Sequence, residues 1–507
     1  MKILAITSRS VTLELDSASP YYSLEEYAVS VNGKYLRGEQ RNVFSVFGLE
    51  PETDYAVTAG NEEVTVKTLS ESCITDIKSF GAKGDGVHDD TAAFLAAVNC
   101  LPPRSTLYIS GGNYFLRPVF LASEITVYLD KEAVITADPD RSHYPVLPAN
   151  IGGRNLGTWQ GEEADCFASV FYSYGTRGVS IIGEGVIDCN ALNGDWYVDH
   201  RKRRGAWRPR GLFFNRCEDL LLQGITVKNT PSWNIHPYFC KRVNLLDLTL
   251  ENPPEMPTTD GIDPDCCDGV NIFGVKISVG DDCIAIKSGT LEFANKYATE
   301  CKNINIRNCL MLKGHGGVVL GSELSGGVNN VSVSQCVFDG TDRGLRIKTR
   351  RGRGRVGGCG GVTFSDIVMR GVKVPFVINM FYNMGDGNGH CKYVWTTEKL
   401  PVDELTPELG SFTFKNMVCS GVEYCAAAVY GLPEAPVESV AFENVRFSYN
   451  TECSAGFPDM REYDTAVKNG GLIFSCVKEV SLKNVTFDGL SGDAVKCENV
   501  ENFDISD

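Results

Sequence analysis

A short apolar pattern that recurs ten times is the feature that most limits how this chain of 507 residues can fold. Each copy contains two β-prone runs separated by Asn, Asp or Gly, and the closest copies begin 23 and 27 residues apart. Repeats of this length are typical of solenoids, and the β-prone composition predicts an all-β, right-handed parallel β-helix with coils stacked at roughly 4.8 Å. The copies begin at Val179, Leu220, Val243, Val270, Ile304, Val331, Val362, Phe412, Val440 and Val480.

A separate unit, a small β-sandwich over residues 1–72, is predicted ahead of the solenoid at residues 73–507. Its apolar residues alternate as in strands, and Val31–Tyr35 predicts a hairpin with an Asn-Gly turn. The run Phe47–Ala59 resembles the signature of fibronectin type III domains, in which a tyrosine, here Tyr55, anchors a corner of the sandwich. We expect this unit to pack against the solenoid; a place beside the functional site or in a dimer contact is the alternative.

Charge and cysteine content exclude some classes of function. A net charge of −16 argues against a general nucleic-acid binder, which needs a basic surface. The 19 cysteines are scattered and include no CxxC pair, so we expect no metal and no cofactor. Unpaired cysteines fit a reducing compartment. The N-terminus lacks the apolar core of a secretory signal. No apolar run approaches the ~20 residues of a membrane helix. These features predict a cytoplasmic protein without a membrane or nucleic-acid partner, and they leave its oligomeric state open.

Three aspartates between Thr258 and Lys287 are the candidate catalytic groups. Asp260 precedes the pair Asp281 and Asp282 by 21 residues, which is about one coil, so all three are expected on one face of the solenoid. Neighbouring residues in a regular strand point to opposite faces, and we expect a turn at Gly280 to aim both aspartates the same way. Repulsion among the three raises the pKa of at least one, which separates a proton donor from water-activating carboxylates as glycosidases require. A hydrated turn is the alternative for an isolated Gly-Asp-Asp.

Cations downstream of the aspartates predict an acidic ligand. Arg346, Lys348 and Arg350 alternate along the chain and therefore share one face of a strand. Arginine can clamp a carboxylate with two hydrogen bonds, and lysine adds a point charge. Further cations lie in the runs Arg350–Arg355 and His200–Arg210, which on an acidic chain favour an acidic oligosaccharide as the partner; a solvated basic loop is the alternative.

Four motifs in order resemble glycoside hydrolase family 28, the polygalacturonase family, over about residues 73–500. They are TTDGIDPD at Thr258, GDDCIAIKSG at Gly280, GHGGVVLGSE at Gly314 and RIKTR at Arg346. The resemblance implies that Asp281 is the general acid and that Asp260 and Asp282 hold the attacking water. It also implies that His315 supports the protonation state of the site and that Arg346 and Lys348 bind the substrate.

Aromatic residues and a second histidine are further candidates for the substrate cleft. Core packing is the alternative for most of them. They are His236 and Trp233 in NTPSWNIHP, Trp196 and Tyr197 in NGDWY, and Tyr382 in NMFYN.

Two departures from the family pattern bear on the mechanism. Thr258 stands where the family commonly has asparagine, which changes the hydrogen bonding next to Asp260. The segment between Asp282 and His315 is long and includes TLEFANKYATE, as in the exo-acting members that the wording GGVVLGSE also resembles. A loop that closes one end of a cleft would limit cleavage to chain ends.

The resulting hypothesis is an exo-polygalacturonase that hydrolyses α-1,4-galacturonosyl linkages with inversion. Inversion predicts acid and base carboxyls roughly 6.5–9.5 Å apart, whereas a separation near ~5 Å is typical of retaining enzymes. The alternatives are a rhamnogalacturonan or xylogalacturonan hydrolase of the same family, a calcium-dependent pectate lyase, and a carbohydrate-binding spike or adhesin without activity.

Overall fold

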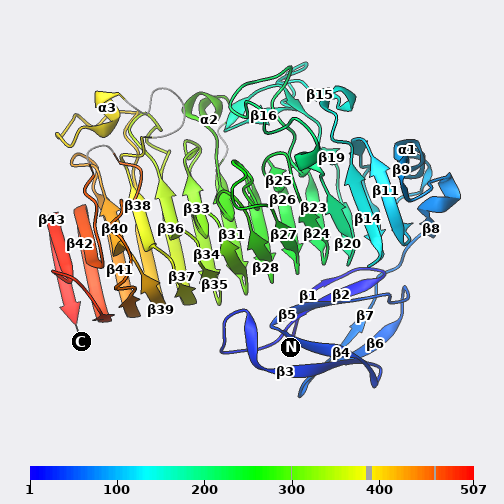
Figure 1. Cartoon of the computed structure of the whole chain (residues 1–507), viewed down its shortest axis with the longest axis horizontal. Helices are drawn as coiled ribbons and strands as arrows, with labels where there is room; N and C mark the ends of the chain where they lie inside the picture. The colour runs from blue at the N-terminus through cyan, green and yellow to red at the C-terminus, as the bar shows by residue number, and fades with distance from the viewer. Residues whose placement is uncertain (298–299, 384–390, 462–463, 507) are drawn as a thin grey trace.

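Most of the chain forms a right-handed parallel β-helix, which confirms the predicted fold class (Figure 1). The computed structural model describes all residues except 298–299, 384–390, 462–463 and 507. Three parallel sheets, called here the first, second and third sheet, run along the solenoid because each coil contributes a strand to two or three of them.

The first sheet extends along the whole solenoid. Its strands are β8 (Ile74–Asp76), β10 (Ser105–Ile109), β13 (Ile125–Leu129), β20 (Ser180–Gly183), β23 (Glu218–Gln223), β26 (Lys241–Leu246), β28 (Asp268–Phe273), β31 (Cys301–Arg307), β34 (Val328–Ser334), β37 (Cys359–Arg370), β39 (Ser411–Val422), β41 (Val437–Tyr449), β42 (Gly470–Asp488) and β43 (Val495–Ser506). The second sheet contains β9 (Asp85–Asp89), β11 (Gly112–Leu116), β14 (Ala133–Ala137), β21 (Val186–Asp188), β24 (Thr226–Lys228), β27 (Thr249–Glu251), β29 (Lys276–Ser278), β32 (Leu310–Lys313) and β35 (Val337–Asp339), and continues into β37.

The third sheet carries the candidate catalytic motifs. Its strands are β12 (Val119–Phe120), β19 (Phe171–Tyr174), β22 (Leu212–Asn215), β25 (Ile235–Tyr238), β30 (Ile284–Ile286), β33 (Val318–Gly321), β36 (Arg343–Lys348), β38 (Val374–Asn379) and β40 (Cys425–Tyr430). Single bridges through Ile262 and Asp265 join β25 to β30 and make the sheet continuous.

The predicted repeat sets the register of the first sheet. Val243 pairs with Val270, Val270 with Ile304, and Ile304 with Val331, and the same alignment continues through Val362 to Val480. These apolar side chains are buried and stack into the interior of the solenoid. Burial of stacked β-branched residues is the main stabilising contribution that this repeat provides.

The N-terminal unit consists of two antiparallel sheets. One contains β1 (Lys2–Ile6), β2 (Ser10–Glu14) and β5 (Val43–Phe47), and the other contains β4 (Lys34–Arg41), β3 (Tyr22–Val31), β6 (Asp54–Ala59) and β7 (Glu62–Lys67). The Tyr55 hydroxyl accepts a hydrogen bond from the Glu50 N–H at 2.8 Å, which ties the chain at the corner before β6. The fibronectin type III assignment and the boundary after residue 72 stay predictions.

The N-terminal unit packs on the ends of strands of the first sheet. Glu14 accepts hydrogen bonds from Arg307 Nε at 2.6 Å and Arg307 Nη2 at 2.7 Å, and another from Asn308 at 2.8 Å. Val43 packs with Leu246 and Phe273 in a small apolar cluster. In Figure 1 this unit lies on one side of the solenoid, and the long loops lie on the other.

Those long loops surround the third sheet. They include the short pairs β15 (Val146–Leu147) with β18 (Cys166–Phe167) and β16 (Thr158–Trp159) with β17 (Glu162–Glu163), and the helices α2 (Leu291–Tyr297) and α3 (Lys392–Trp395). The remaining helices are α1 (Thr91–Cys100), at the N-terminal end of the solenoid, and three 3₁₀ turns, Ile77–Phe80, Arg141–His143 and Ala191–Asn193. Among the described residues, no helix has the length and apolar character required to cross a membrane.

Candidate active site

The three predicted aspartates lie together beside the third sheet. Asp260 is two residues before Ile262, which bridges to both Ile235 and Ile284, while Asp281 and Asp282 come just before β30. Gly280 allows the tight turn that this requires, since a Cβ atom there would lie 2.2 Å from the Met256 carbonyl oxygen. One carboxylate oxygen from each aspartate lies within 4.8 Å of the others.

One oxygen from each carboxyl lies within 4.8 Å of the others, which is a nearest-oxygen contact and not the separation between the acid and base carboxyl groups. The separation of roughly 6.5–9.5 Å that accompanies inversion therefore stays a prediction.

Burial separates the three aspartates into two deep groups and one accessible group. The side chains of Asp282 and Asp260 are 2% and 6% exposed, whereas that of Asp281 is 25% exposed. His315, which is 51% exposed, places Nδ1 3.3 Å from Asp281 Oδ1. The Asp281–His315 pair is thus the part of the cluster that a sugar can reach directly.

Hydrogen bonds fix the orientation of the Asp281 carboxyl. The Thr258 N–H donates to Asp281 Oδ2 at 3.1 Å, and the Asp282 N–H donates to Asp281 Oδ1 at 3.0 Å. Burial alone raises the pKa of Asp281, but the hydrogen bond and charge of His315, with Lys348 and Lys287, outweigh burial and lower this pKa to about 2. The same hydrogen bond raises the pKa of His315.

Protonation of the deeper groups follows from burial and crowding of negative charge. Burial, followed by the charges of Asp263 and Asp281, raises the pKa of Asp260 well above its ordinary value. Burial raises the pKa of Asp263 to about 8, although Lys287 opposes this. These pKa shifts favour protons on Asp260, Asp263 and His315 over a proton on Asp281.

Buried cations offset the negative charge of the cluster. Lys348 Nζ lies 2.7 Å from Asp282 Oδ2, and Arg346 Nη1 lies 3.9 Å from Asp282 Oδ1. Lys287 Nζ lies 3.8 Å from Asp260 Oδ2. Three carboxylate oxygens at this spacing have the geometry to hold a cation, but the ammonium groups already occupy that electrostatic role. We therefore interpret the cluster as a catalytic site rather than a metal site.

Of the predicted substrate-binding cations, Arg346 and Lys348 lie beside the acids, and all three cations are largely buried. Arg346, Lys348 and Arg350 are 4%, 7% and 4% exposed, and Tyr382 is 9% exposed with its ring 5.6 Å from Lys348 Nζ. Arg346 directs Nε and Nη2 to the carboxylate of Asp459, with the Nε bond at 3.0 Å. The bidentate edge of Arg346 is thus occupied, and Nη1 is the donor that remains near the acids.

The prediction that His236 contacts the substrate directly is wrong. His236 is fully buried, stacks on Phe213, and places Nε2 3.5 Å from Asp265. Burial lowers its pKa to about 4, so the ring is neutral at pH values above this. Of the aromatic candidates, Trp196 is fully buried against Tyr144 and Phe167, and Trp233 is 4% exposed against His236. Core packing, the alternative for both tryptophans, is what the structure shows.

Four residues of the site were not among the sequence candidates. Lys287 Nζ lies 3.4 Å from Asp263 and 3.7 Å from Glu323, in addition to its contact with Asp260. Lys287, Glu323 and Asp263 lie within three of the quoted motifs, so their motif position was an available signal. Asp459 comes from a distant loop and has no comparable signal in the sequence.

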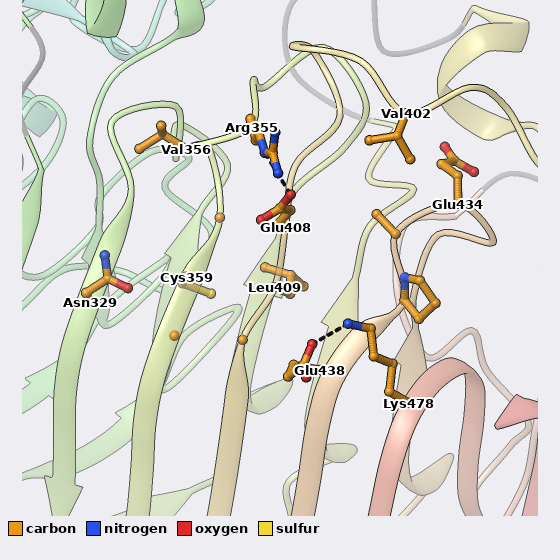
Figure 2. A pocket seen from close by; sticks show the side chains of 15 residues that line it. Asn329, Arg355, Val356, Cys359, Val402, Glu408, Leu409, Glu434, Glu438 and Lys478 are labelled. Atoms are coloured by element: carbon orange, nitrogen blue, oxygen red, sulfur yellow. Dashed lines mark hydrogen bonds and ion pairs between the residues drawn. The ribbon is translucent and has the colours of Figure 1, made fainter. Parts of the chain in front are cut away.

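A hollow of about 600 Å³ lies elsewhere on the solenoid (Figure 2). None of the residues lining it belongs to the acid cluster or its cations. Its charged groups already pair with one another: Arg355 lies 2.9 Å from Glu408, and Lys478 lies 2.6 Å from Glu438. We therefore place the chemistry at the aspartates and not in this hollow.

Comparison with known proteins agrees with this placement. The sequence profile described as "Glycosyl hydrolases family 28" matches residues 151–454, which include the acid cluster and its three buried cations, Lys287, Arg346 and Lys348. A "Probable polygalacturonase" of Vitis vinifera is 30% identical over 377 residues, covering 72% of each chain. The solved structure of a family 28 exopolygalacturonase from Yersinia enterocolitica superposes with a TM-score of 0.73 at 20% identity, covering 99% of this chain and 97% of that one. An exopolygalacturonase from Thermotoga maritima gives a TM-score of 0.67 at 23% identity, covering 83% and 93%.

Proposed function

Since this chain belongs to family 28 of the glycosyl hydrolases, we propose that it is an exo-polygalacturonase that releases galacturonate from oligogalacturonides. The observation that carries the proposal is the placement of Lys348 and Arg346 next to Asp282, 2.7 Å and 3.9 Å away. Besides offsetting the charge of Asp282, these two cations lie where they can attract a sugar carboxylate, which a neutral sugar does not have. The names of the relatives support the same substrate class.

We propose that Asp281 protonates the leaving oxygen, because it is the most accessible of the three carboxyls. The proton on His315 Nδ1, 3.3 Å away, passes to Asp281 Oδ1. Protonating Asp281 removes one of the charges that raise the pKa of Asp260, after burial and the charge of Asp263, and so favours the ionised form of Asp260. We propose that Asp260 and Asp282, which lie deepest in the site, hold the attacking water and accept its proton.

Inversion is proposed from the number of carboxylates rather than from their spacing. A retaining enzyme needs one carboxylate free to attack carbon, but Asp282 is held by Lys348 and is 2% exposed. Two deep carboxylates on adjacent coils suit a water molecule better than a sugar carbon. Proton NMR of fresh hydrolysate tests this: the β-anomer should appear first, and initial α-anomer would refute a single displacement.

Exo action is supported by loops that pack together next to the acids. The Thr290 N–H donates to the Gly161 carbonyl at 3.0 Å, and the Ser288 N–H donates to the Glu323 carbonyl at 2.7 Å. Glu323 in turn lies 3.7 Å from Lys287. We propose that this wall ends the substrate site, so that only a terminal residue of the sugar chain can bind beyond the scissile bond.

A product profile on defined oligogalacturonides tests the function. Release of monomer with a labelled remainder that shortens one residue at a time supports exo action, and an immediate ladder of internal products refutes it. Asp281→Asn should abolish turnover while the substrate still binds. An unsaturated, ultraviolet-absorbing product would instead identify a lyase, and absence of any cleavage of galacturonan would refute the proposed substrate.

We also propose that the protein works in a reducing compartment such as the cytoplasm. Most of its 19 cysteines are buried, where the thiol acts as a small apolar side chain. Import of short oligogalacturonides would then supply the substrate. Fractionation of the producing cells tests this proposal, and recovery of the enzyme outside the cell would refute it.

A further inference from the structure

Thr258 has a backbone conformation that its residue type disfavours. Its φ is +58°, in the left-handed region, where a β-branched side chain is an outlier. Asparagine, the residue that commonly occupies this place in the similar motif, tolerates this region much better. The conformation matters because the Thr258 N–H donates to Asp281 Oδ2 at 3.1 Å, and two residues later the chain reaches Asp260.

Arg208 is placed to hold Thr258 in this conformation. Its Nη2 donates to Thr258 Oγ1 at 2.6 Å, and its Nη1 donates to the Pro231 carbonyl oxygen at 2.6 Å. The guanidinium also lies 5.5 Å from the Trp159 ring centroid and 5.7 Å from that of Tyr197. Two hydrogen bonds and two ring contacts leave the guanidinium little freedom to move.

The surroundings of Arg208 exclude a direct contact with solvent-borne substrate. The residue is 4% exposed, and the two oxygens that accept its hydrogen bonds, those of Pro231 and Thr258, belong to the protein. Burial lowers the pKa of Arg208 to about 10, so the guanidinium stays charged at neutral pH. The hydrogen bond to Thr258 Oγ1 is therefore charge-assisted and of the stronger class.

We propose that Arg208 is a positioning residue that clamps Thr258 in the left-handed conformation and, through the Thr258 N–H, orients the carboxyl of Asp281. The pair Arg208–Thr258 thus replaces an asparagine that needs no clamp. This inference rests on the proposed function only in taking Asp281 as the proton donor. A carboxyl that loses one of its two orienting N–H groups no longer presents Oδ1 to His315 in a single geometry.

A double-mutant cycle tests the clamp. Arg208→Gln should lower kcat by about 10²-fold, the scale of loss for a misplaced catalytic group, with a smaller change in KM. Adding Thr258→Asn to Arg208→Gln should restore kcat by at least ~10-fold, since asparagine adopts the left-handed conformation unaided. Arg177→Gln, at an exposed arginine paired with Asp219, is the matched control.

A purely structural role for Arg208 gives a different result. In that case Arg208→Gln lowers the melting temperature and activity together, and Thr258→Asn restores neither, which would overturn the proposal. If Arg208→Gln does not fold, Arg208→Lys retains the charge and removes the two-point hydrogen bonding, and the same rescue is expected.

Crystal structures of the same variants test the clamp of Arg208 on Thr258 independently of any activity measurement. Arg208→Gln should move Thr258 out of the left-handed region and lengthen its N–H contact with Asp281, and the double variant should restore that contact. Unchanged geometry at residue 258 in Arg208→Gln would refute the clamp. A wild-type enzyme that cleaves no galacturonan would instead refute the proposed function and leave this structural comparison as the deciding result.

Discussion

Replacing His315 with glutamine should move the alkaline limb of the pH profile to lower pH. In the wild type, the Asp281–His315 pair keeps one transferable proton at every pH below the pKa of His315. Its contact with Asp281 raises that pKa above the ordinary value of 6.5. In His315→Gln the only remaining proton site of this pair is Asp281, whose pKa lies at about 2 while the histidine is charged. Loss of the cation raises the pKa of Asp281, because the ionised carboxylate loses its stabilising partner.

The size of the shift follows from the 3.3 Å contact between His315 Nδ1 and Asp281 Oδ1. Coulomb's law gives about 5 kcal/mol at an effective dielectric constant of ~20 and about 1.3 kcal/mol in bulk water. His315 is 51% exposed, so screening places the interaction between these limits, equivalent to about 1–2 pKa units. The Asp281 carboxyl in the variant should therefore titrate near pH ~4, and activity at pH 7 should be about 10³-fold below its acid plateau.

Initial rates on trigalacturonate between acid and neutral pH measure this shift. His143→Gln is the control, since His143 also pairs with a carboxylate, Asp138 at 2.6 Å, but lies outside the acid cluster; its profile should match the wild type. An alkaline limb that stays above pH 6.5 in His315→Gln would show that the proton does not come from this pair. A uniform loss at every pH would assign His315 to substrate contact instead.

Two further substitutions test the supports of the site and of the solenoid. Glu14→Gln weakens the hydrogen bonds from Arg307 and should lower the free energy of unfolding, measured by urea titration, by about 1–3 kcal/mol. As a control, Glu63→Gln at an exposed position should change this free energy by less than about 0.5 kcal/mol. Asp459→Asn removes the carboxylate that accepts two hydrogen bonds from the buried guanidinium of Arg346, and it should lower the free energy of unfolding by about 3 kcal/mol. Unchanged thermal stability would mean that Asp282 alone is a sufficient charged partner for Arg346.

The fold was predictable because one physical rule relates the sequence to the structure. In a parallel β-helix each coil stacks on the one before it, so an apolar residue that recurs once per coil must meet its own counterpart. Val243, Val270 and Ile304 do so in direct register. The same rule brought Asp260 beside Asp281 and Asp282, since 21 residues make one coil.

Contacts made by loops were not predictable by this rule. Asp459 reaches Arg346 across 113 residues from a loop outside the repeat. The 50 residues between Arg208 and Thr258, in contrast, equal the two coil steps from Leu220 to Val270, so the repeat does relate these two positions. Residue type also does not tell whether a side chain faces the substrate cleft or the protein interior. His236 and Trp196 are residue types that often bind sugars, but both are buried in the interior. A polar or aromatic side chain can satisfy its hydrogen bonds and packing on either side of a strand, so composition alone does not choose between them.

The separation of the catalytic carboxyls shows how the fold constrains the chemistry. Adjacent coils stack at roughly 4.8 Å, so acids at equivalent positions on neighbouring coils start from that distance unless their side chains diverge. The nearest oxygens of Asp260, Asp281 and Asp282 lie within 4.8 Å of one another, as acids on neighbouring coils with converging side chains would. On such a scaffold this contact reflects the stacking of the coils and does not report the stereochemistry. The anomer first released is therefore the measurement that decides between inversion and retention, and burial, which places Asp281 outermost, is the stronger structural guide to which carboxyl gives the proton.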